Sequence, residues 1–155
     1  MFTGLFGRTS ALQRIFPRLT ISRRNVVAEA AIASGNGSVV VDWLSGACFL
    51  ARRASLEAVG GFDRRFFLYW EDADFCRRAR DRGWETWYHP GVQVTHLAGR
   101  SSATAYWPSR VAFHHSVYLY FRKHAGPLGR LLSPVVWLGV RARLTLERLA
   151  PGRRR

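Results

Sequence analysis

The chain has 155 residues and carries 24 lysine and arginine residues against 10 aspartate and glutamate residues, which gives a formal net charge of +14. This length suits one ordinary domain with a single core, and a hydrophobic content of 48% excludes an intrinsically disordered chain. The basic excess favours an anionic partner, such as a phosphate, a phospholipid surface or a nucleic acid. However, Lys123 is the only lysine. Selection for nucleic-acid binding seldom excludes lysine so completely, so the arginine preference argues against a nucleic-acid partner.

Signals for export and membrane insertion are weak. Arg8 and Arg14 interrupt the apolar start, so we expect no signal peptide. The longest uncharged run near the C-terminus, LLSPVVWLGV, has ten residues, and a bilayer needs about 20. Cys48 and Cys76 have no zinc-type or C-x-x-C spacing, so we expect reduced core thiols. These features predict a cytoplasmic protein and leave open a contact with the inner face of the plasma membrane.

The pattern is weak over residues 1–38, where RTSALQRIF favours a short helix and SGNGS favours a loop. From Val39, VVVDW predicts a buried strand, LSGA a turn, and CFLARR a second extended segment. ASLEAVGG then predicts a short helix, with Ser55 as its N-cap and Gly60-Gly61 at its end.

The stretch FFLYWEDADFCRRARDRGW predicts an apolar strand or loop followed by a helix. Glu71, Asp72 and Asp74 fall in the first turn, where carboxylates suit the positive end of the helix dipole. Glu71 and Asp74 share one face, whereas Asp72 points elsewhere. Gly83 is expected at the C′ position.

Three carboxylates so close together repel each other unless a cation lies nearby. Arg77 and Arg78 are placed to neutralise Glu71 and Asp74, which is the structural interpretation of this cluster. A ligand is the other interpretation, and spacing alone does not decide between them.

After this helix, WETWYH and VQVTHL predict two strands separated by Pro90-Gly91. In the second strand Val92, Val94 and His96 share one face. A histidine at such a strand end suits metal ligation or a phosphate contact, but a half-buried structural histidine has the same pattern. Residues 107–125 predict a further helix, on which His114, His115 and His124 are expected as surface or amphipathic-helix residues.

The last segment predicts a helix with Ser133 as its N-cap, Pro134 at its first helical position and Pro151-Gly152 at its end. One side carries apolar residues, expected to be Leu132, Val135, Val136, Val140 and Leu146. Arg141 and Arg148 lie opposite, and Arg143 does not fit the pattern. Two interpretations remain: an interfacial membrane helix whose arginines face lipid phosphates, or a helix that packs on its own domain or on a partner.

WLSGACFLARR and VGGFDRRFFLYWEDADFCRRARDRGWETWYHPGVQVTHLAGRSS together resemble the second half of the GT-A domain in family 2 glycosyltransferases. The likeness is greatest to the rhamnosyltransferase-like branch that builds cell-envelope polysaccharide, and it rests on the order of W-x-S-G-A, G-G-F-D, E-D-x-D, G-W, P and H-x-x-G-x-S. It implies an α/β fold: a partial GT-A (Rossmann-like) domain, its acceptor-side half, over residues 39–125. Residues 1–38 would be a variable segment, and residues 126–155 amphipathic, basic C-terminal helix and tail.

The resemblance implies inverting transfer of a sugar from a nucleotide-diphosphate sugar to a hydroxyl of a lipid-linked or polysaccharide acceptor. In that family the aspartate of the E-D pair is the general base, and it corresponds to Asp72. The histidine of H-x-x-G-x-S corresponds to His96, a ligand of Mg²⁺ or Mn²⁺ in some relatives. Small residues line the donor cleft and correspond to Ser45, Gly46 and Ala47, while acceptor contacts fall to Trp70, Glu71 and Asp74.

The family's nucleotide-binding half and its earlier D-x-D motif have no counterpart in residues 1–38, because Asp42 is the first aspartate. Asp72-Ala73-Asp74 has the form of that metal motif, but the motifs that follow it favour the later E-D-x-D helix. We therefore expect this chain to be inactive alone: a truncated reading frame, a remnant, or a subunit completed by another chain. The alternative function is a non-catalytic basic module that binds an anionic membrane surface or nucleic acid.

Overall fold

The computed structural model describes residues 37–96 and 105–149, which belong to two compact units. Unit 1 contains residues 37–42 and 86–93 of the described part, and unit 2 contains the rest. The helix predicted from RTSALQRIF and the helix end predicted at Pro151-Gly152 lie outside the described residues. The predicted domain boundaries at residues 38 and 125 stay predictions.

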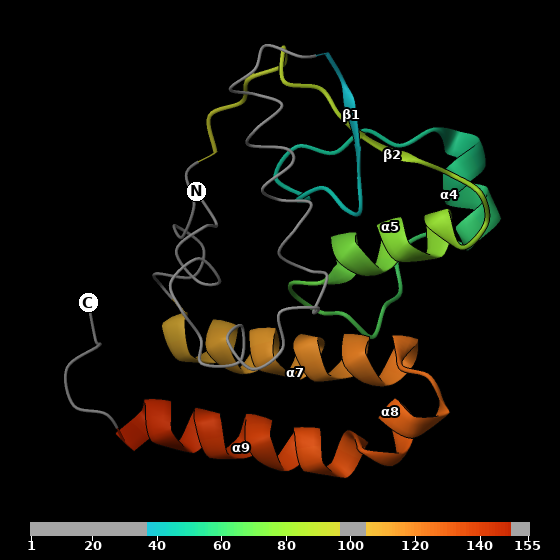
Figure 1. Ribbon diagram of the computed structural model, residues 1–155. Coiled ribbons are helices and arrows are strands. Elements are labelled where there is room, and N and C mark those ends of the chain that lie inside the picture. The colour runs from blue at the N-terminus through green and yellow to red at the C-terminus, as the bar shows by residue number, and fades with distance from the viewer. Residues whose placement is uncertain (1–36, 97–104, 150–155) are drawn as a thin grey trace. The chain divides into compact units, whose positions relative to one another are not determined.

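Unit 1 contains a two-stranded antiparallel sheet of β1 (Val39–Val41) and β2 (Thr86–Tyr88), drawn in Figure 1. A hydrogen bond between Ser38 Oγ and His89 Nδ1 joins the two chain segments next to the Val39–Tyr88 pair of the sheet. Both predicted strands exist, but in β1 only Val41 is buried, so the expectation of a wholly buried strand is wrong.

The strand predicted from VQVTHL is not found in its described part. Residues 92–96 have no regular secondary structure, and all of them are exposed. Alternating β-branched residues favour a strand only where a neighbouring strand and a buried face are available. The expected common face of Val92, Val94 and His96 is therefore wrong.

Unit 2 begins with a turn at Gly46-Ala47, as predicted, but CFLARR forms no second strand. Helix α4 (Arg53–Val59) begins at the last residue of that stretch. Arg52, not Ser55, is the N-cap, because Ser55 lies within the first turn and its hydroxyl donates to the Arg52 carbonyl over 2.7 Å. Gly60, with φ of 74°, ends the helix as predicted.

Helix α5 (Glu71–Arg80) confirms the strongest sequence prediction, with the three carboxylates in its first turn. FFLYW before it is a loop rather than a strand and ends in two left-handed residues, Tyr69 and Trp70. The helix ends at Arg80 with Asp81 as its C-cap, so Arg82 occupies the C′ position predicted for Gly83, and Gly83, with φ of 84°, follows one position later.

The core of unit 2 forms between α4 and α5. Its buried members are Val59, Phe75, Cys76 and Ala79, and the residues packed against them are Trp43, Phe49, Ala51, Leu56 and Trp84. The Phe49 and Phe75 rings meet edge to face, with centroids 5.4 Å apart. Cys76 is thus a core thiol as expected, whereas Cys48 is exposed, so that part of the prediction is wrong.

Three helices complete unit 2: α7 (Tyr106–His124), α8 (Pro127–Leu131) and α9 (Ser133–Leu149). The predicted helix over 107–125 is confirmed. The short α8 turns the chain back, so that α9 lies antiparallel beside α7 (Figure 1). The Tyr118 and Trp137 rings, with centroids 4.9 Å apart, lie in the contact between these helices.

Helix α9 starts at Ser133 itself, so this residue is not the N-cap that the sequence predicted. The predicted apolar side is also divided by the structure. Val136 and Val140 are half-buried, while Leu132, Val135 and Leu146 are exposed. No helix in the described residues is long and apolar enough to cross a membrane.

Candidate functional site at the start of helix α5

The carboxylate of Asp72 lies at the first turn of α5, half-buried, and is held by two backbone amides. Gly46 N–H donates to Oδ2 over 2.8 Å, and Ala73 N–H donates to Oδ1 over 2.7 Å. The first bond brings the Ser45-Gly46-Ala47 turn to the start of α5, although 26 positions separate the two partners. The structure therefore brings together Asp72 and the three residues predicted to line the donor cleft.

The turn itself is compact and its backbone is exposed at Gly46. Ala47 N–H donates to Ser45 Oγ over 3.3 Å. A methyl group placed on Gly46 would lie 3.7 Å from Asp72 Oδ2 and 3.8 Å from its Cβ, which is ordinary contact. The turn therefore approaches the carboxylate closely without needing glycine for space, and Asp72 remains half-buried.

Glu71 lies directly before Asp72 but in a different environment. Its Oε2 is buried and has no hydrogen-bond partner within the described residues. Burial raises the pKa of Glu71, the negative charge of Asp72 raises it further, and a bond from its own backbone N–H opposes both. The site therefore contains two adjacent carboxyl groups, Asp72 held by two amides and Glu71 with a raised pKa.

The segment that leads into α5 is anchored on α7 by aromatic contacts. The Trp70 ring lies 5.1 Å from the Tyr120 ring and 6.3 Å from the Phe113 ring, measured between centroids. Ser116 Oγ also donates to the Leu68 carbonyl over 2.9 Å. These contacts fix the left-handed backbone of Trp70, and the predicted acceptor contact of its side chain stays a prediction.

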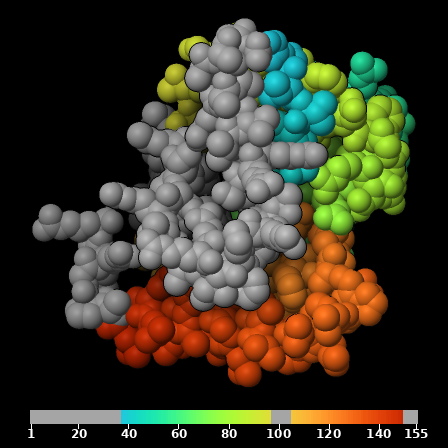
Figure 2. All heavy atoms as spheres, in the orientation of Figure 1, coloured from blue at the N-terminus to red at the C-terminus, as the bar shows by residue number. Residues whose placement is uncertain are grey.

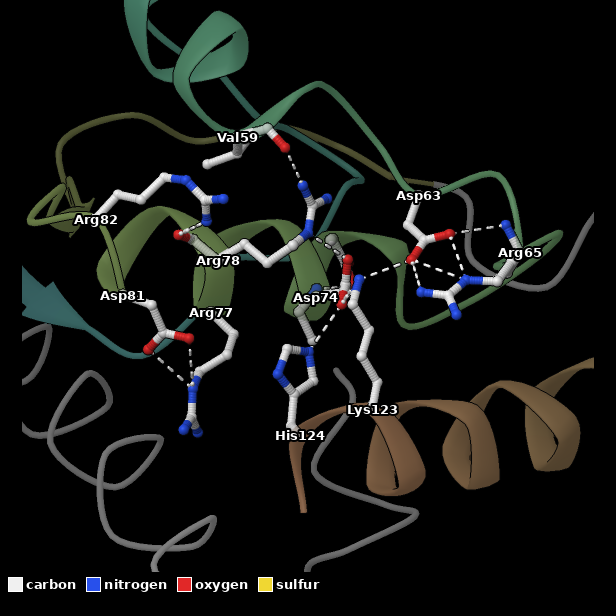
Figure 3. Close-up of polar contacts among 12 residues, drawn as sticks. Val59, Asp63, Arg65, Asp74, Arg77, Arg78, Asp81, Arg82, Lys123 and His124 are labelled. Atoms are coloured by element: carbon white, nitrogen blue, oxygen red, sulfur yellow. Dashed lines mark hydrogen bonds and ion pairs between the residues drawn. The ribbon is translucent and has the colours of Figure 1, made fainter. Parts of the chain in front are cut away.

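Asp74 has no exposed surface and is surrounded by cations, as Figure 3 shows. Its carboxylate lies 2.7 Å from Arg78 Nε, 2.7 Å from Lys123 Nζ and 2.8 Å from His124 Nε2. Burial alone would raise the pKa of Asp74, but the bonds from Lys123, His124 and Arg78 outweigh burial and hold that pKa below its ordinary value. This carboxylate has no surface to offer an acceptor in the structure, and it joins α5 to α7.

The same cations extend this arrangement to the end of α4. Lys123 Nζ also lies 2.7 Å from Asp63 Oδ2, and the Arg78 guanidinium donates to the Val59 and Gly61 carbonyls over 2.6 and 2.7 Å (Figure 3). We call Asp63, Asp74, Arg78, Lys123 and His124 the Asp74 cluster. Bonds from Arg65 and Lys123 hold the pKa of Asp63 well below its usual range.

Sequence reasoning identified only part of this cluster. The expected pair of Asp74 with Arg78 is confirmed, but Arg77 bonds Asp81 on its own helix over 3.2 Å rather than Glu71. His114 and His124 lie on helix α7 as expected, but neither is a surface residue, because His114 is buried and His124 faces Asp74. The sequence held one signal for this cluster. Lys123 is the single lysine in a chain that otherwise uses arginine, and it is the residue that bonds both Asp63 and Asp74.

His96, the predicted metal ligand, is exposed and stands at the end of a described segment. The rest of its H-x-x-G-x-S motif lies outside the described residues. Among the residues that the structure describes, no three histidine, cysteine, aspartate or glutamate side chains gather into a group that could hold a metal. Metal binding by His96 therefore stays a prediction.

Comparison with known proteins identifies the same region. Residues 10–111, more than half of the chain, match the family model described as glycosyltransferase like family 2. An N-acetylglucosaminyl-diphospho-decaprenol L-rhamnosyltransferase of Mycobacterium tuberculosis, known from the CDC 1551 and H37Rv strains, is 39% identical over 87 residues. Rhamnosyltransferase WbbL of Escherichia coli K12 is 39% identical over 59 residues.

These alignments cover only part of each protein. The mycobacterial alignment spans 56% of this chain and 28% of the relative, and the Escherichia coli alignment spans 38% and 22%. The chain thus corresponds to less than a third of the curated relatives it matches. No solved structure matches it.

Proposed function

Because this chain belongs to glycosyltransferase like family 2, we propose that unit 2 supplies the acceptor side of a sugar transferase. Family membership implies the GT-A fold, an α/β arrangement. One observation carries the proposal: Asp72, at the start of α5, accepts a hydrogen bond from the Gly46 amide of the W-L-S-G-A turn. A carboxylate so fixed, beside an open turn of small residues, suits proton transfer at a sugar hydroxyl.

Asp72 is the proposed general base of an inverting transfer. Its carboxylate takes the proton of the acceptor hydroxyl while that oxygen attacks the anomeric carbon, and the nucleoside diphosphate leaves with the electrons of the broken bond. The Gly46 and Ala73 amides orient the carboxylate through one lone pair on each oxygen. Positioned base catalysis of this kind typically contributes about 10²–10⁴-fold in rate.

Glu71 and Trp70 are the proposed acceptor contacts. A neutral Glu71 carboxyl can donate a hydrogen bond to an acceptor oxygen, which an ionised carboxylate cannot do. We propose that Asp74, in contrast, positions the start of α5 through the Asp74 cluster. Ser45 and Ala47 complete the small-residue wall beside Asp72.

The substrates are proposed from the names of the relatives. A rhamnosyltransferase that acts on N-acetylglucosaminyl-diphospho-decaprenol suggests a nucleotide-diphosphate rhamnose as donor and a lipid-linked sugar diphosphate as acceptor. Such an acceptor is consistent with a cytoplasmic protein that works at the inner face of the plasma membrane.

A divalent cation, Mg²⁺ or Mn²⁺, is a further part of the proposal. His96 would supply one ligand, and such an ion would stabilise the negative charge of the departing diphosphate. The described residues form no complete metal site, so we derive no step through the ion. The remaining ligands and the donor-binding half would come from residues outside this part of the chain.

A chimaera that joins the N-terminal part of the mycobacterial relative to this chain tests the assignment. We expect rhamnose transfer from the nucleotide-diphosphate donor to a polyprenyl-diphosphate-linked acceptor, and no transfer by the 155-residue chain alone. Asp72→Asn should lower kcat about 10²–10⁴-fold. Asp81→Asn, on the exposed side of the same helix, is the matched control, and it should retain activity. Full turnover by the Asp72→Asn chimaera would overturn the assignment of the base.

A further inference from the structure

Helix α9 and the short α8 before it carry several large apolar side chains that are exposed to solvent. On α9 the exposed residues Val135, Leu138, Leu146 and Leu149 follow one another at intervals of three, eight and three positions, which places them on one face of the helix. We call this set the apolar stripe: Leu128, Leu131, Leu132, Val135, Leu138, Leu146 and Leu149. Leu138 is 66% exposed and Leu146 is 68% exposed, so these large side chains are not core residues seen at their edges. Figure 2 shows α8 and α9 as one band of atoms coloured orange to red.

The opposite side of α9 is the side that packs on α7. Val136, Val140 and Leu144 are half-buried there. Glu147 also faces α7, because its carboxylate accepts a bond from Arg110 over 2.6 Å. The need for a core within unit 2 therefore explains one apolar face of α9 and leaves the second, the stripe, without an explanation.

The charges on α8 and α9 are almost all positive. Glu147 is the only acidic residue between Pro127 and Leu149, and it is occupied by Arg110 and by Arg143. At 100° per residue, Arg143 lies on one flank of the stripe and Arg141 and Arg148 lie on the other. Arg141 and Arg148 also lie over the Trp137 and Trp107 rings, at 5.8 and 6.0 Å from the ring centroids. An apolar face is thus bordered on both sides by guanidinium groups.

We propose that the apolar stripe docks on an anionic phospholipid surface. Its leucines enter the boundary between headgroups and acyl chains, and the flanking arginines reach the lipid phosphates. With 17 residues, α9 is about 25 Å long, and no described helix can span a bilayer. The helix therefore lies in the plane of the membrane surface.

Charge complementarity favours lipid over a second copy of the chain. A symmetric dimer through the stripe would bring the arginines of two copies, in a protein of net charge +14, against one another. An anionic bilayer provides an apolar medium for the leucines and negative charge for the arginines.

Flotation of the full 155-residue chain with lipid vesicles tests the proposal. We expect the protein to float with vesicles that contain phosphatidylglycerol and to remain at the bottom with pure phosphatidylcholine. Leu138→Glu combined with Leu146→Glu should lower the partition coefficient about a hundredfold or more, because each leucine insertion contributes about tenfold or more. Leu50→Glu, at a leucine that is 97% exposed outside the stripe, is the control and should bind like the wild type.

A second pair of variants isolates the arginines without altering the leucines. Arg141→Gln with Arg148→Gln should weaken binding about fivefold for each charge removed. Arg53→Gln with Arg64→Gln removes the same net charge from exposed positions elsewhere in unit 2, and it should have a clearly smaller effect. Circular dichroism of each variant shows whether α9 still folds, and the arginine pair provides the test if the leucine pair does not fold.

Three results would overturn the proposal. One is the absence of flotation with anionic vesicles. Another is flotation that the leucine pair leaves unchanged, which would indicate attraction by net charge alone. The third is a wild type that does not bind vesicles and is dimeric in light scattering, while the folded Leu138→Glu, Leu146→Glu double variant is monomeric. This result would assign the stripe to contact with a second copy of the chain. None of these measurements requires sugar transfer, so a failure here is separate from a failure of the proposed function.

Discussion

Two carboxylates, Asp74 and Glu147, each bind several basic side chains, but they do so in different surroundings. Asp74 joins α5 to α7 and has no exposed surface. Glu147 joins α9 to α7 through Arg110, and its side chain is 25% exposed. The chain has 24 basic and only 10 acidic residues, and these two acidic residues lie at contacts between helices. Each therefore links two helices through its ion pairs.

The histidines in the two places show what the difference means. His124 bonds Asp74 over 2.8 Å. His114 Nε2 lies 3.7 Å from Glu147 and has no hydrogen-bond partner within the described residues. Burial lowers the pKa of His114, and the nearby Arg110 and Arg143 lower it further against the attraction of Glu147. Asp74 is therefore fully buried and bonded to three basic side chains, while Glu147 is partly exposed and lies beside a histidine whose pKa is lowered.

Asp74→Asn is expected to have the largest effect on stability. It would leave Arg78, Lys123 and His124 around a neutral amide in a buried site, and breaking a buried pair typically costs about 3–5 kcal/mol of unfolding free energy. Urea denaturation followed by tryptophan fluorescence measures the change. Asp81→Asn removes an exposed pair with Arg77 on the same helix, and should cost less than about 1 kcal/mol. Equal losses in the two variants would contradict the role of the Asp74 cluster.

The pH dependence of this difference follows from the lowered pKa of Asp74. A carboxyl whose pKa is lower in the folded chain contributes stability above its ordinary pKa of 3.8, and that contribution is lost as the pH falls through the folded value. The stability gap between the wild type and Asp74→Asn should therefore shrink as the pH falls below about pH 4. A gap that stays the same at pH 3 would show that Asp74 is not stabilised as an anion.

Glu147→Gln should have a smaller effect than Asp74→Asn. Bonds from Arg110 and Arg143 hold the pKa of Glu147 down against its burial, but the partly exposed site can admit water to the arginines. We expect a loss of about 1–2 kcal/mol in the same denaturation measurement. Glu57→Gln, in an exposed pair with Arg53, provides the control and should change stability by less than about 0.5 kcal/mol. A loss of unfolding free energy as large as that of Asp74→Asn would contradict the proposed difference between Asp74 and Glu147.

Local signals in the sequence were enough to predict α5 and the long helix before Gly126. Acids in the first turn, arginines in the last and a glycine beyond the end act within a few residues of one another. The strands predicted from CFLARR and VQVTHL are not found, because a strand needs a partner strand and the local pattern does not specify one. For α9, residue spacing showed an apolar surface, but only the contact with α7 decided that Val136 faces inward and Val135 outward.

The candidate site shows the same limit. The resemblance to a family pointed to Asp72 and to the Ser45-Gly46-Ala47 turn, and the structure brings these residues together through the bond from Gly46. The Asp74 cluster was only half predicted, because Arg78 lies one turn away on α5, whereas His124 lies 50 positions along the chain. Spacing within one helix identifies the first kind of partner and carries no information about the second.

Glu71→Gln should have the smallest effect and the opposite sign. The Oε2 atom of Glu71 is buried and has no hydrogen-bond partner within the described residues, the carboxyl lies beside Asp72, and its pKa is raised. A raised pKa means that the folded chain binds this proton more tightly than the unfolded chain, so ionisation of Glu71 reduces stability as the pH rises through its ordinary value. A neutral amide avoids that penalty. At pH 7 we expect the variant to be as stable as the wild type or more stable by up to about 1 kcal/mol, with the gain disappearing near pH 4. A clear loss of stability at pH 7 would show that Glu71 bonds a group outside the described residues, and the proposed neutral carboxyl at the acceptor site would have to be withdrawn.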